Sequence, residues 1–266
     1  MIKMIVTDID GTILKKDFTI SNNVINTIKK LTQNNIKVVL ATGRMYCAAV
    51  KIANMLDINT PLICYQGALI KNFYDNNNTL YIDPVKPNLA FEILNVLKTK
   101  NIHTNLYLND RLFCENDNQI IKDYTNKRLI PYSVVNNLLD LDLNNQVNKI
   151  LAIDNDSQVI ENLTSELKNK YNDSLYVVRS TKNFCEISSK NSNKGLAVKF
   201  LANLFNINKN EILAIGDEDN DIDLLKSSNY KIAMGNASEK LKENADFITK
   251  SIDDDGFVYA INKYCL

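Results

Sequence analysis

Several residue types are scarce in this chain, and their scarcity argues against particular kinds of chemistry. Among its 266 residues there is no tryptophan and one histidine, His103, which falls in an expected strand and is expected to have a core or surface role. No Gly-x-Ser-x-Gly, Cys/His pair or Gly-x-Gly-x-x-Gly pattern occurs. Serine-type hydrolysis and hydride transfer therefore lack their usual sequence marks.

Cysteine is too sparse and too scattered to build a framework. The chain has an odd number of cysteines and no Cys-x-x-Cys pair, which predicts reduced, mostly buried thiols and indicates neither disulfides nor zinc. The five positions are Cys47, Cys64, Cys114, Cys185 and Cys265.

The chain also lacks an excess of charge and a long apolar run. Its 31 basic residues balance 31 acidic ones, so there is no electrostatic footprint for nucleic acid or an anionic membrane. No apolar stretch approaches the roughly 18 residues of a membrane span, and the N-terminus runs into an acidic turn rather than a signal peptide. We expect a cytoplasmic protein, a monomer or weak homodimer, whose partners are small molecules, not nucleic acid or membrane.

What the chain does contain is an ordered alternation of strand and helix patterns. The strand patterns are continuous apolar runs, which are typical of parallel strands covered by helices on both faces. This order predicts an α/β fold with a doubly wound, Rossmann-like parallel sheet. The expected elements are strands at 2–10, 36–43 and 61–70 and helices at 22–35 and 44–57, the first helix capped by Ser21.

The middle third of the chain has a different organisation. Pro84 and Pro87 interrupt regular structure, and the segment that follows mixes helices and strands in an α+β order. The strand and helix alternation returns after it. We therefore expect a core built from residues 1–83 and 189–266, with residues 84–188 inserted as a second domain.

Polar residues gather where the expected core strands end. In open parallel sheets, ligands bind beyond the carboxyl ends of the strands. Asp8 and Asp10 follow the first strand, Thr42 follows the second, and the acidic run GDEDND at 216–221 follows a later one, while Lys194 opens a helix. These four places are the candidate site.

The carboxylates among them point to a cation. Asp8 and Asp10 project to the same side of a strand, and their repulsion predicts a shared proton or a bound cation. Asp217 supplies a third carboxylate, and hard oxygen ligands suit Mg²⁺ better than zinc. With an ammonium at Lys194 and a hydroxyl at Thr42, such a site favours a phosphate ligand and phosphoryl chemistry.

Each feature has an ordinary structural explanation when taken alone. Asp-x-Asp-Gly can be a simple turn, Thr42 a strand-end hydroxyl, Lys194 a solvated helix start, and the acidic run a helix cap. Their occurrence together and in this order favours a site. Calcium is disfavoured because the glycine after Asp10 comes two positions early for an EF-hand, and Leu224 stands where the other loop needs glycine.

The four motifs together resemble the haloacid dehalogenase-like superfamily of phosphatases. They are DIDGT at 8–12, TGR at 42–44, Lys194 and GDEDND at 216–221, and the resemblance extends over essentially the whole chain. The large insert is similar to the cap domain of the Cof-type branch, the sugar-phosphate phosphatases. The branch usually has Asn-Gly-Ala after the third strand, where this chain has Gln-Gly-Ala at 66–68.

The resemblance implies a role for each motif residue. Asp8 would be the nucleophile that forms an aspartyl-phosphate, and Asp10 the acid and base, with its backbone carbonyl on Mg²⁺. Asp8 and Asp217 would complete the protein's share of the magnesium ligands. Thr42 and Lys194 would hold the phosphoryl group.

The remaining motif residues would support the phosphate or the substrate. Asp221 would assist from behind the metal ligands, and the segments 234–237 and 254–257 are expected near the site. The residues expected to bind phosphate or substrate are Gly11, Thr12, Gly43, Arg44 and Asn220. Substrate choice is expected to depend on the insert, with 179–188 as the specificity strand and Tyr107, Arg111, Arg179 and Phe184 as candidate residues.

The function expected from these observations is a Mg²⁺-dependent phosphomonoester hydrolase acting on a small phosphorylated metabolite. One alternative is a phosphomutase or phosphotransferase on the same scaffold, in which a sugar hydroxyl replaces water. A second is a non-catalytic regulator that binds phosphorylated metabolites. The complete set of Asp8, Asp10, Thr42, Lys194 and Asp217 weighs against the regulator, which has no chemical need for all five.

Overall fold

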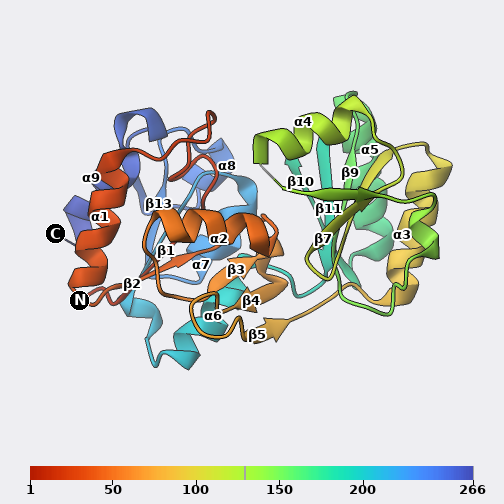
Figure 1. Cartoon of the computed structure of the whole chain (residues 1–266). Coiled ribbons are helices and arrows are strands. Elements are labelled where there is room, and N and C mark those ends of the chain that lie inside the picture. Colours follow the sequence, from red (N-terminus) through yellow and green to blue (C-terminus); the bar gives the residue numbers. More distant parts are fainter. Residues whose placement is uncertain (129, 266) are drawn as a thin grey trace. The chain divides into compact units, whose positions relative to one another are not determined.

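The chain forms two compact units, and the computed structural model describes residues 1–128 and 130–265 (Figure 1). The first, the core unit, comprises Met1–Arg44, Ala49–Tyr81 and Asn193–Leu266. The second, the insert unit, comprises Met45–Ala48 and Ile82–Ser192. The sequence predicted an insert over residues 84–188, and the main segment of the observed insert unit is Ile82–Ser192. The sequence did not predict that Met45–Ala48 belongs to the insert unit.

The core unit is built on a parallel sheet of five strands. Its strand order is β14-β13-β12-β1-β2, so the first strand of the sequence lies between one from the C-terminal part and the second strand. This confirms the predicted Rossmann-like parallel sheet. The strands are β1 (Met4–Thr7), β2 (Lys37–Leu40), β12 (Ile212–Gly216), β13 (Tyr230–Ala233) and β14 (Phe247–Ile248).

Helices pack against this sheet, and the first of them begins at a residue whose side chain caps it. Ser21 accepts a hydrogen bond from the Val24 amide at the start of α1 (Asn22–Gln33), as predicted. Helix α9 (Gly256–Tyr264), which the sequence patterns did not predict, lies beside α1 (Figure 1). The other helices are α2 (Tyr46–Met55), α6 (Lys194–Leu204), α7 (Ile222–Lys226) and α8 (Glu239–Lys242).

The single strand predicted over 61–70 is wrong. The segment forms β3 (Leu62–Cys64) and β4 (Leu69–Lys71), which pair antiparallel across the turn Tyr65–Gly67 and continue into β5 (Thr79–Ile82) as a small sheet. Three successive residues in the turn have positive φ angles of 51°, 59° and 104°. The apolar run is continuous because both strands of this hairpin are buried, so periodicity did not mark the reversal.

The insert unit contains a six-stranded, mainly antiparallel sheet of order β10-β11-β9-β6-β7-β8, with β7 and β8 parallel. This agrees with the predicted α+β composition. The elements are α3 (Pro87–Thr99), β6 (His103–Leu108), β7 (Arg111–Cys114), α4 (Gln119–Arg128), β8 (Tyr132–Val134), β9 (Val147–Ile153), α5 (Ser157–Tyr171), β10 (Leu175–Thr181) and β11 (Phe184–Ser189).

One face of the insert sheet forms an apolar core with α3 and α5. Leu106, Ile150 and Ile187 pack there against helix residues such as Leu97 and Leu163. The residues that alternate with them along the strands face the other side. In the part of the chain that the structure describes, no helix combines the length and apolar character needed to cross a membrane.

Candidate active site

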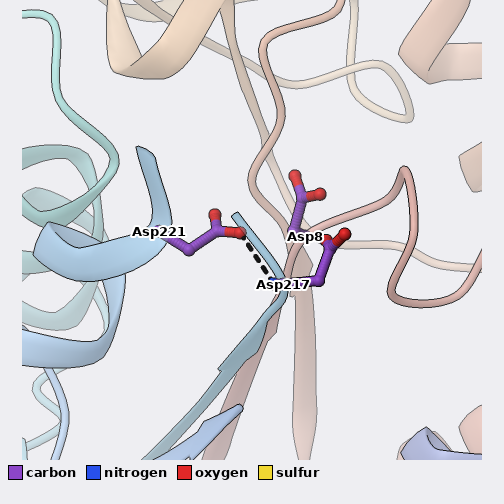
Figure 2. Close-up of side chains that lie close together, drawn as sticks. All are labelled: Asp8, Asp217 and Asp221. Carbon is purple, nitrogen blue, oxygen red and sulfur yellow. Dashed lines mark hydrogen bonds between the residues drawn. The ribbon is translucent and has the colours of Figure 1, made fainter. Parts of the chain in front are cut away.

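Asp8 and Asp217 follow two neighbouring strands at the same edge of the core sheet. Strands β1 and β12 pair in parallel, with Thr7 opposite Ile215, and the Asp8 amide donates to the Ile215 carbonyl at 3.0 Å. Both aspartates are buried, with 7% and 6% of their surface exposed. Parallel pairing thus brings together two carboxylates that are separated by more than 200 residues in the sequence (Figure 2).

A third carboxylate, that of Asp221, completes a cluster. One oxygen from each of Asp8, Asp217 and Asp221 lies within 4.8 Å of the others. Asp221 lies in the 3₁₀ turn Asp219–Asp221, and its Oδ2 accepts a hydrogen bond from the Asp217 amide at 3.0 Å (Figure 2). The same oxygen accepts from the Glu218 amide at 3.2 Å. Asp221 therefore fixes the backbone from which Asp217 projects.

Lys194 is the cation inside this cluster. It is the first residue of α6, whose N-cap Asn193 accepts from the Leu196 amide. Its Nζ donates to Oδ1 of Asp8 at 2.6 Å and to Oδ1 of Asp221 at 2.6 Å, and its side chain is 1% exposed. The start of the helix thus delivers a buried ammonium to two buried acids.

The cluster holds more negative charge than Lys194 neutralises. Burial raises the pKa of Asp8 to about 7 against the attraction of Lys194, and the charges of Asp221 and Asp10 raise it further. Burial, then the charges of Asp8 and Asp221, raise the pKa of Asp217 to about 9. Burial lowers the pKa of Lys194, but the two acids that it contacts outweigh burial and raise it above its usual range. A bound cation would relieve this repulsion.

The donor set fits Mg²⁺. Oδ1 of Asp8 contacts Lys194, and Oδ1 of Asp217 accepts the Thr12 hydroxyl hydrogen bond at 2.9 Å. The second oxygen of each carboxylate remains as a hard ligand of the kind that Mg²⁺ prefers. Both oxygens of Asp221 are already engaged, which makes it a support for the site and a poorer ligand candidate.

Gly11 lets the turn after β1 pass close to Asp217. Its φ is +78°, and a Cβ atom built at this position would lie 2.1 Å from Oδ2 of Asp217. Both the left-handed backbone and the close approach therefore require glycine. The neighbouring Asn236 donates to the Gly11 carbonyl at 2.9 Å, which brings the segment 234–237 to the turn.

Asp10 is turned toward Arg44 instead of the acidic cluster. Its carboxylate accepts from Nε of Arg44 at 2.7 Å and from Nη2 at 2.6 Å. The Asp10 side chain is 56% exposed, whereas that of Arg44 is 7% exposed. The structure therefore pairs two residues to which the sequence had assigned separate roles, Asp10 as acid and base and Arg44 at the substrate.

Thr42 and Gly43 lie in the loop that follows β2. Thr42 is buried, and its Oγ1 accepts a hydrogen bond from the Arg44 amide at 3.1 Å. Its backbone amide donates to Ile63, and its carbonyl accepts from Gln66. The loop is thus attached to the β3–β4 hairpin.

Gln66 contacts Asn220, a contact that the sequence did not predict. Nδ2 of Asn220 donates to Oε1 of Gln66 at 3.1 Å, and Gln66 sits in the left-handed turn with φ 59°. Oδ1 of Asn220 is buried and has no hydrogen-bond partner among residues 1–128 and 130–265. The one feature of the sequence that drew attention to this position was Gln66 itself, where the Cof-type branch usually has asparagine.

The C-terminal segment 254–257 is tied to α1 through Asp255. Its two carboxylate oxygens accept from Ser21 and Asn23, each at 2.6 Å. These bonds lower the pKa of Asp255, with the contact from Asn23 as the largest cause. The observed contacts of Asp255 thus attach the start of α9 to the start of α1.

The four candidate specificity residues of the insert unit have different surroundings. Tyr107 is buried with its hydroxyl 2.5 Å from that of Tyr124, and Phe184 packs against the Tyr124 ring. The Arg179 guanidinium contacts Glu161 and two backbone carbonyls, whereas Arg111 is exposed.

A buried ion pair, Lys149–Glu186, lies on the same face of the insert sheet as Tyr107, with 3.2 Å between Nζ and Oε2. This pair was not predicted from the sequence. A charged residue within each apolar strand pattern was the available signal. His103, the lone histidine, is half-buried, and its ring nitrogens lie near the amides of Asn105 and Asn118.

Comparison with known proteins identifies the family of the chain. The sequence profile of the haloacid dehalogenase-like hydrolases matches residues 5–261. A Haemophilus influenzae protein is 31% identical over 267 residues, covering 99% of this chain and 98% of its own length. The 5-amino-6-(5-phospho-D-ribitylamino)uracil phosphatase YitU of Bacillus subtilis is 26% identical over 265 residues, covering 98% of this chain and 97% of its own length.

Solved structures show the same architecture. A Thermotoga maritima protein superposes with a TM-score of 0.87 at 31% identity, covering 100% of this chain and 98% of the other. A haloacid dehalogenase-like hydrolase from Bacteroides thetaiotaomicron gives 0.88 at 27% identity, covering 99% of each chain. The chain belongs to the haloacid dehalogenase-like hydrolases, as the four motifs predicted. Its fold, with the large insert, is that of the predicted Cof-type branch. The prediction that the chain is a phosphatase agrees with the name of its Bacillus subtilis relative YitU.

Proposed function

We propose that the protein is a Mg²⁺-dependent phosphomonoester hydrolase that works through an aspartyl-phosphate on Asp8. The observation that carries the proposal is the placement of Lys194, 2.6 Å from Asp8 and buried beside two further carboxylates. A buried ammonium and a surplus of hard oxygen ligands are the electrostatic parts that phosphoryl transfer needs.

The first half-reaction joins phosphorus to Asp8. One oxygen of the Asp8 carboxylate attacks phosphorus, an O–P bond forms, and the bond from phosphorus to the leaving oxygen breaks. Asp10 gives its proton to that oxygen. Lys194, which donates to Oδ1 of Asp8, offsets negative charge throughout.

The second half-reaction releases phosphate. Asp10 takes a proton from water, the water oxygen attacks phosphorus, and the O–P bond to Asp8 breaks to give inorganic phosphate and free Asp8. When bound, Mg²⁺ would be held by Asp8, Asp217 and the backbone carbonyl of Asp10, and would neutralise charge on the phosphoryl oxygens. Thr12 keeps Asp217 oriented for this through its hydroxyl hydrogen bond.

The substrate that we propose is a small phosphorylated metabolite, such as a sugar phosphate. The support is that a relative matching nearly the whole chain is named for a phosphorylated ribitylamino compound. The decisive measurement is release of inorganic phosphate from a panel of small phosphomonoesters, with Mg²⁺ and with EDTA. Phosphate release that requires Mg²⁺ and no bisphosphate activator supports the hydrolase, whereas transfer of phosphate to a second hydroxyl without net release would establish the mutase or phosphotransferase.

A further inference from the structure

The contact between Arg44 and Asp10 is a two-point hydrogen-bonded ion pair. Nε of Arg44 donates to one carboxylate oxygen at 2.7 Å, and Nη2 donates to the other at 2.6 Å. A planar guanidinium held by both oxygens fixes the orientation of a carboxylate as well as its position. Because Asp10 is 56% exposed, little else nearby restricts its side chain.

Arg44 is well placed to act as the fixed partner. Its side chain is 7% exposed, and its guanidinium carbon lies 5.6 Å from the centre of the Phe18 ring. Its backbone is held at both ends, since its amide donates to Oγ1 of Thr42 and its carbonyl accepts from the Tyr65 amide at 3.0 Å. An anchored arginine therefore meets a more exposed aspartate.

This geometry assigns Arg44 a task different from direct phosphate binding. The guanidinium edge formed by Nε and Nη2 is occupied by Asp10, so presenting that edge to phosphate would break both hydrogen bonds. We propose that Arg44 is a positioning residue that holds the Asp10 carboxylate in the orientation needed for proton transfer, with Phe18 supporting Arg44 from the side. The inference rests on the proposed function, because it takes Asp10 as the acid and base.

Loss of this contact would leave the Asp10 carboxylate in a less defined position and orientation. An exposed aspartate without a partner samples several rotamers, and a misplacement of about 1 Å can slow an enzymatic step by about 10²-fold. Binding of the phosphoryl group, which depends on other residues, should be little affected. The expected signature is a lower kcat with an unchanged KM.

The test is a double-mutant cycle built from Arg44→Gln, Asp10→Asn and the two combined. We expect Arg44→Gln alone to lower kcat about 10–100-fold, with KM and product inhibition by inorganic phosphate within about twofold of the wild type. In the Asp10→Asn background the same change should cost less than about twofold, because Arg44 acts through Asp10. Arg44→Lys keeps the positive charge but cannot donate two parallel hydrogen bonds to the carboxylate. Its kcat should therefore lie between those of Arg44→Gln and the wild type.

Two results would overturn the inference. One is a rise in KM and in the phosphate inhibition constant at unchanged kcat, which would make Arg44 a phosphate ligand. The other is an equal loss of kcat in both backgrounds, which would make its effect independent of Asp10. If the proposed function itself fails, the wild type releases no phosphate from any substrate, an outcome distinct from both.

A general loss of structure is separated by further measurements. Thermal unfolding of each variant reports folding, and Arg44→Lys replaces Arg44→Gln in the cycle if the latter does not fold. Lys231→Gln serves as the matched charge control, because Lys231 pairs with Asp246 at 3.5 Å and both are partly exposed. This control should retain wild-type kcat.

Discussion

Lys194 donates a 2.6 Å hydrogen bond to Asp8 although both side chains are nearly removed from solvent, at 1% and 10% exposure. Burying an ion pair costs desolvation energy that attraction offsets only when the geometry is good and the remaining bonds are satisfied. Asp221 supplies such a bond, since it accepts from the same ammonium and from two backbone amides. A cluster of buried charged groups with such a desolvation cost is typical of an active site.

Replacing Lys194 by methionine should abolish most turnover while preserving the length of the side chain. The substitution leaves Asp8 and Asp221 without their shared cation, so charge developing on the phosphoryl group is no longer offset. We expect kcat to fall by about 10²–10³-fold. Lys199→Met, which removes an exposed charge from the same helix, should leave kcat unchanged. Equal activity of the two variants would contradict this role for Lys194.

Replacing Gly11 should damage the metal site whatever the new residue. Alanine is strained at a φ of +78°, and its Cβ would meet Oδ2 of Asp217 at 2.1 Å. A strain of about 1–3 kcal/mol would weaken Mg²⁺ binding and lower the thermal stability. Gly11→Asn tolerates the left-handed backbone but has the same Cβ atom, so it should also raise the Mg²⁺ concentration for half-maximal activity. Normal Mg²⁺ dependence in the asparagine variant would show that Asp217 does not need the close approach.

The metal-free protein should lose stability as the pH rises, and Mg²⁺ should restore it. The pKa values of Asp8 and Asp217, about 7 and about 9, lie above the ordinary value of 3.8. Their protonated forms therefore stabilise the fold fully below about pH 4, and this contribution is lost as the pH rises through about 7 and about 9. Mg²⁺ binds the deprotonated carboxylates, so its effect on Tm should be larger at pH 8 than at pH 5.

The control for this pH dependence is Asp217→Asn. The variant removes one of the two titrating carboxyls, so both the pH dependence of Tm and the stabilisation by Mg²⁺ should be smaller. Thermal unfolding of the wild type and the variant, in EDTA and in Mg²⁺ at pH 5 and pH 8, measures both quantities. A Mg²⁺ effect that is identical at pH 5 and pH 8 would contradict the electrostatic account of the cluster.

The sequence predicted the parallel sheet because buried strands have a direct signature. Continuous apolar runs in the sequence correspond to β1, β2 and β12, and such runs are typical of the parallel strands of a doubly wound core. Ser21 correctly predicted the start of α1. The reversal at Tyr65–Gly67 was hidden because both arms of that hairpin are buried. Strand β8 and helix α9 were missed, and β8 is only three residues long.

The candidate site could be predicted in part for a related reason. Positions after parallel strands converge by topology alone, which is why Asp8 and Asp217 could be grouped before their contacts were known. The pairings of Asp10 with Arg44 and of Gln66 with Asn220 depend on side-chain directions and turn geometry. No spacing in the sequence encodes those directions.

Asp8→Asn tests the central claim most directly, because an amide cannot act as the attacking carboxylate. The measurement is phosphate release with Mg²⁺, together with acid-quench trapping of covalently bound phosphate from a radiolabelled substrate. The account predicts labelled wild-type protein and, for Asp8→Asn, no label and a fall in turnover of about 10⁴-fold or more. Undiminished Mg²⁺-dependent turnover by Asp8→Asn, or a label that persists in that variant, would contradict the assignment of Asp8 as the nucleophile.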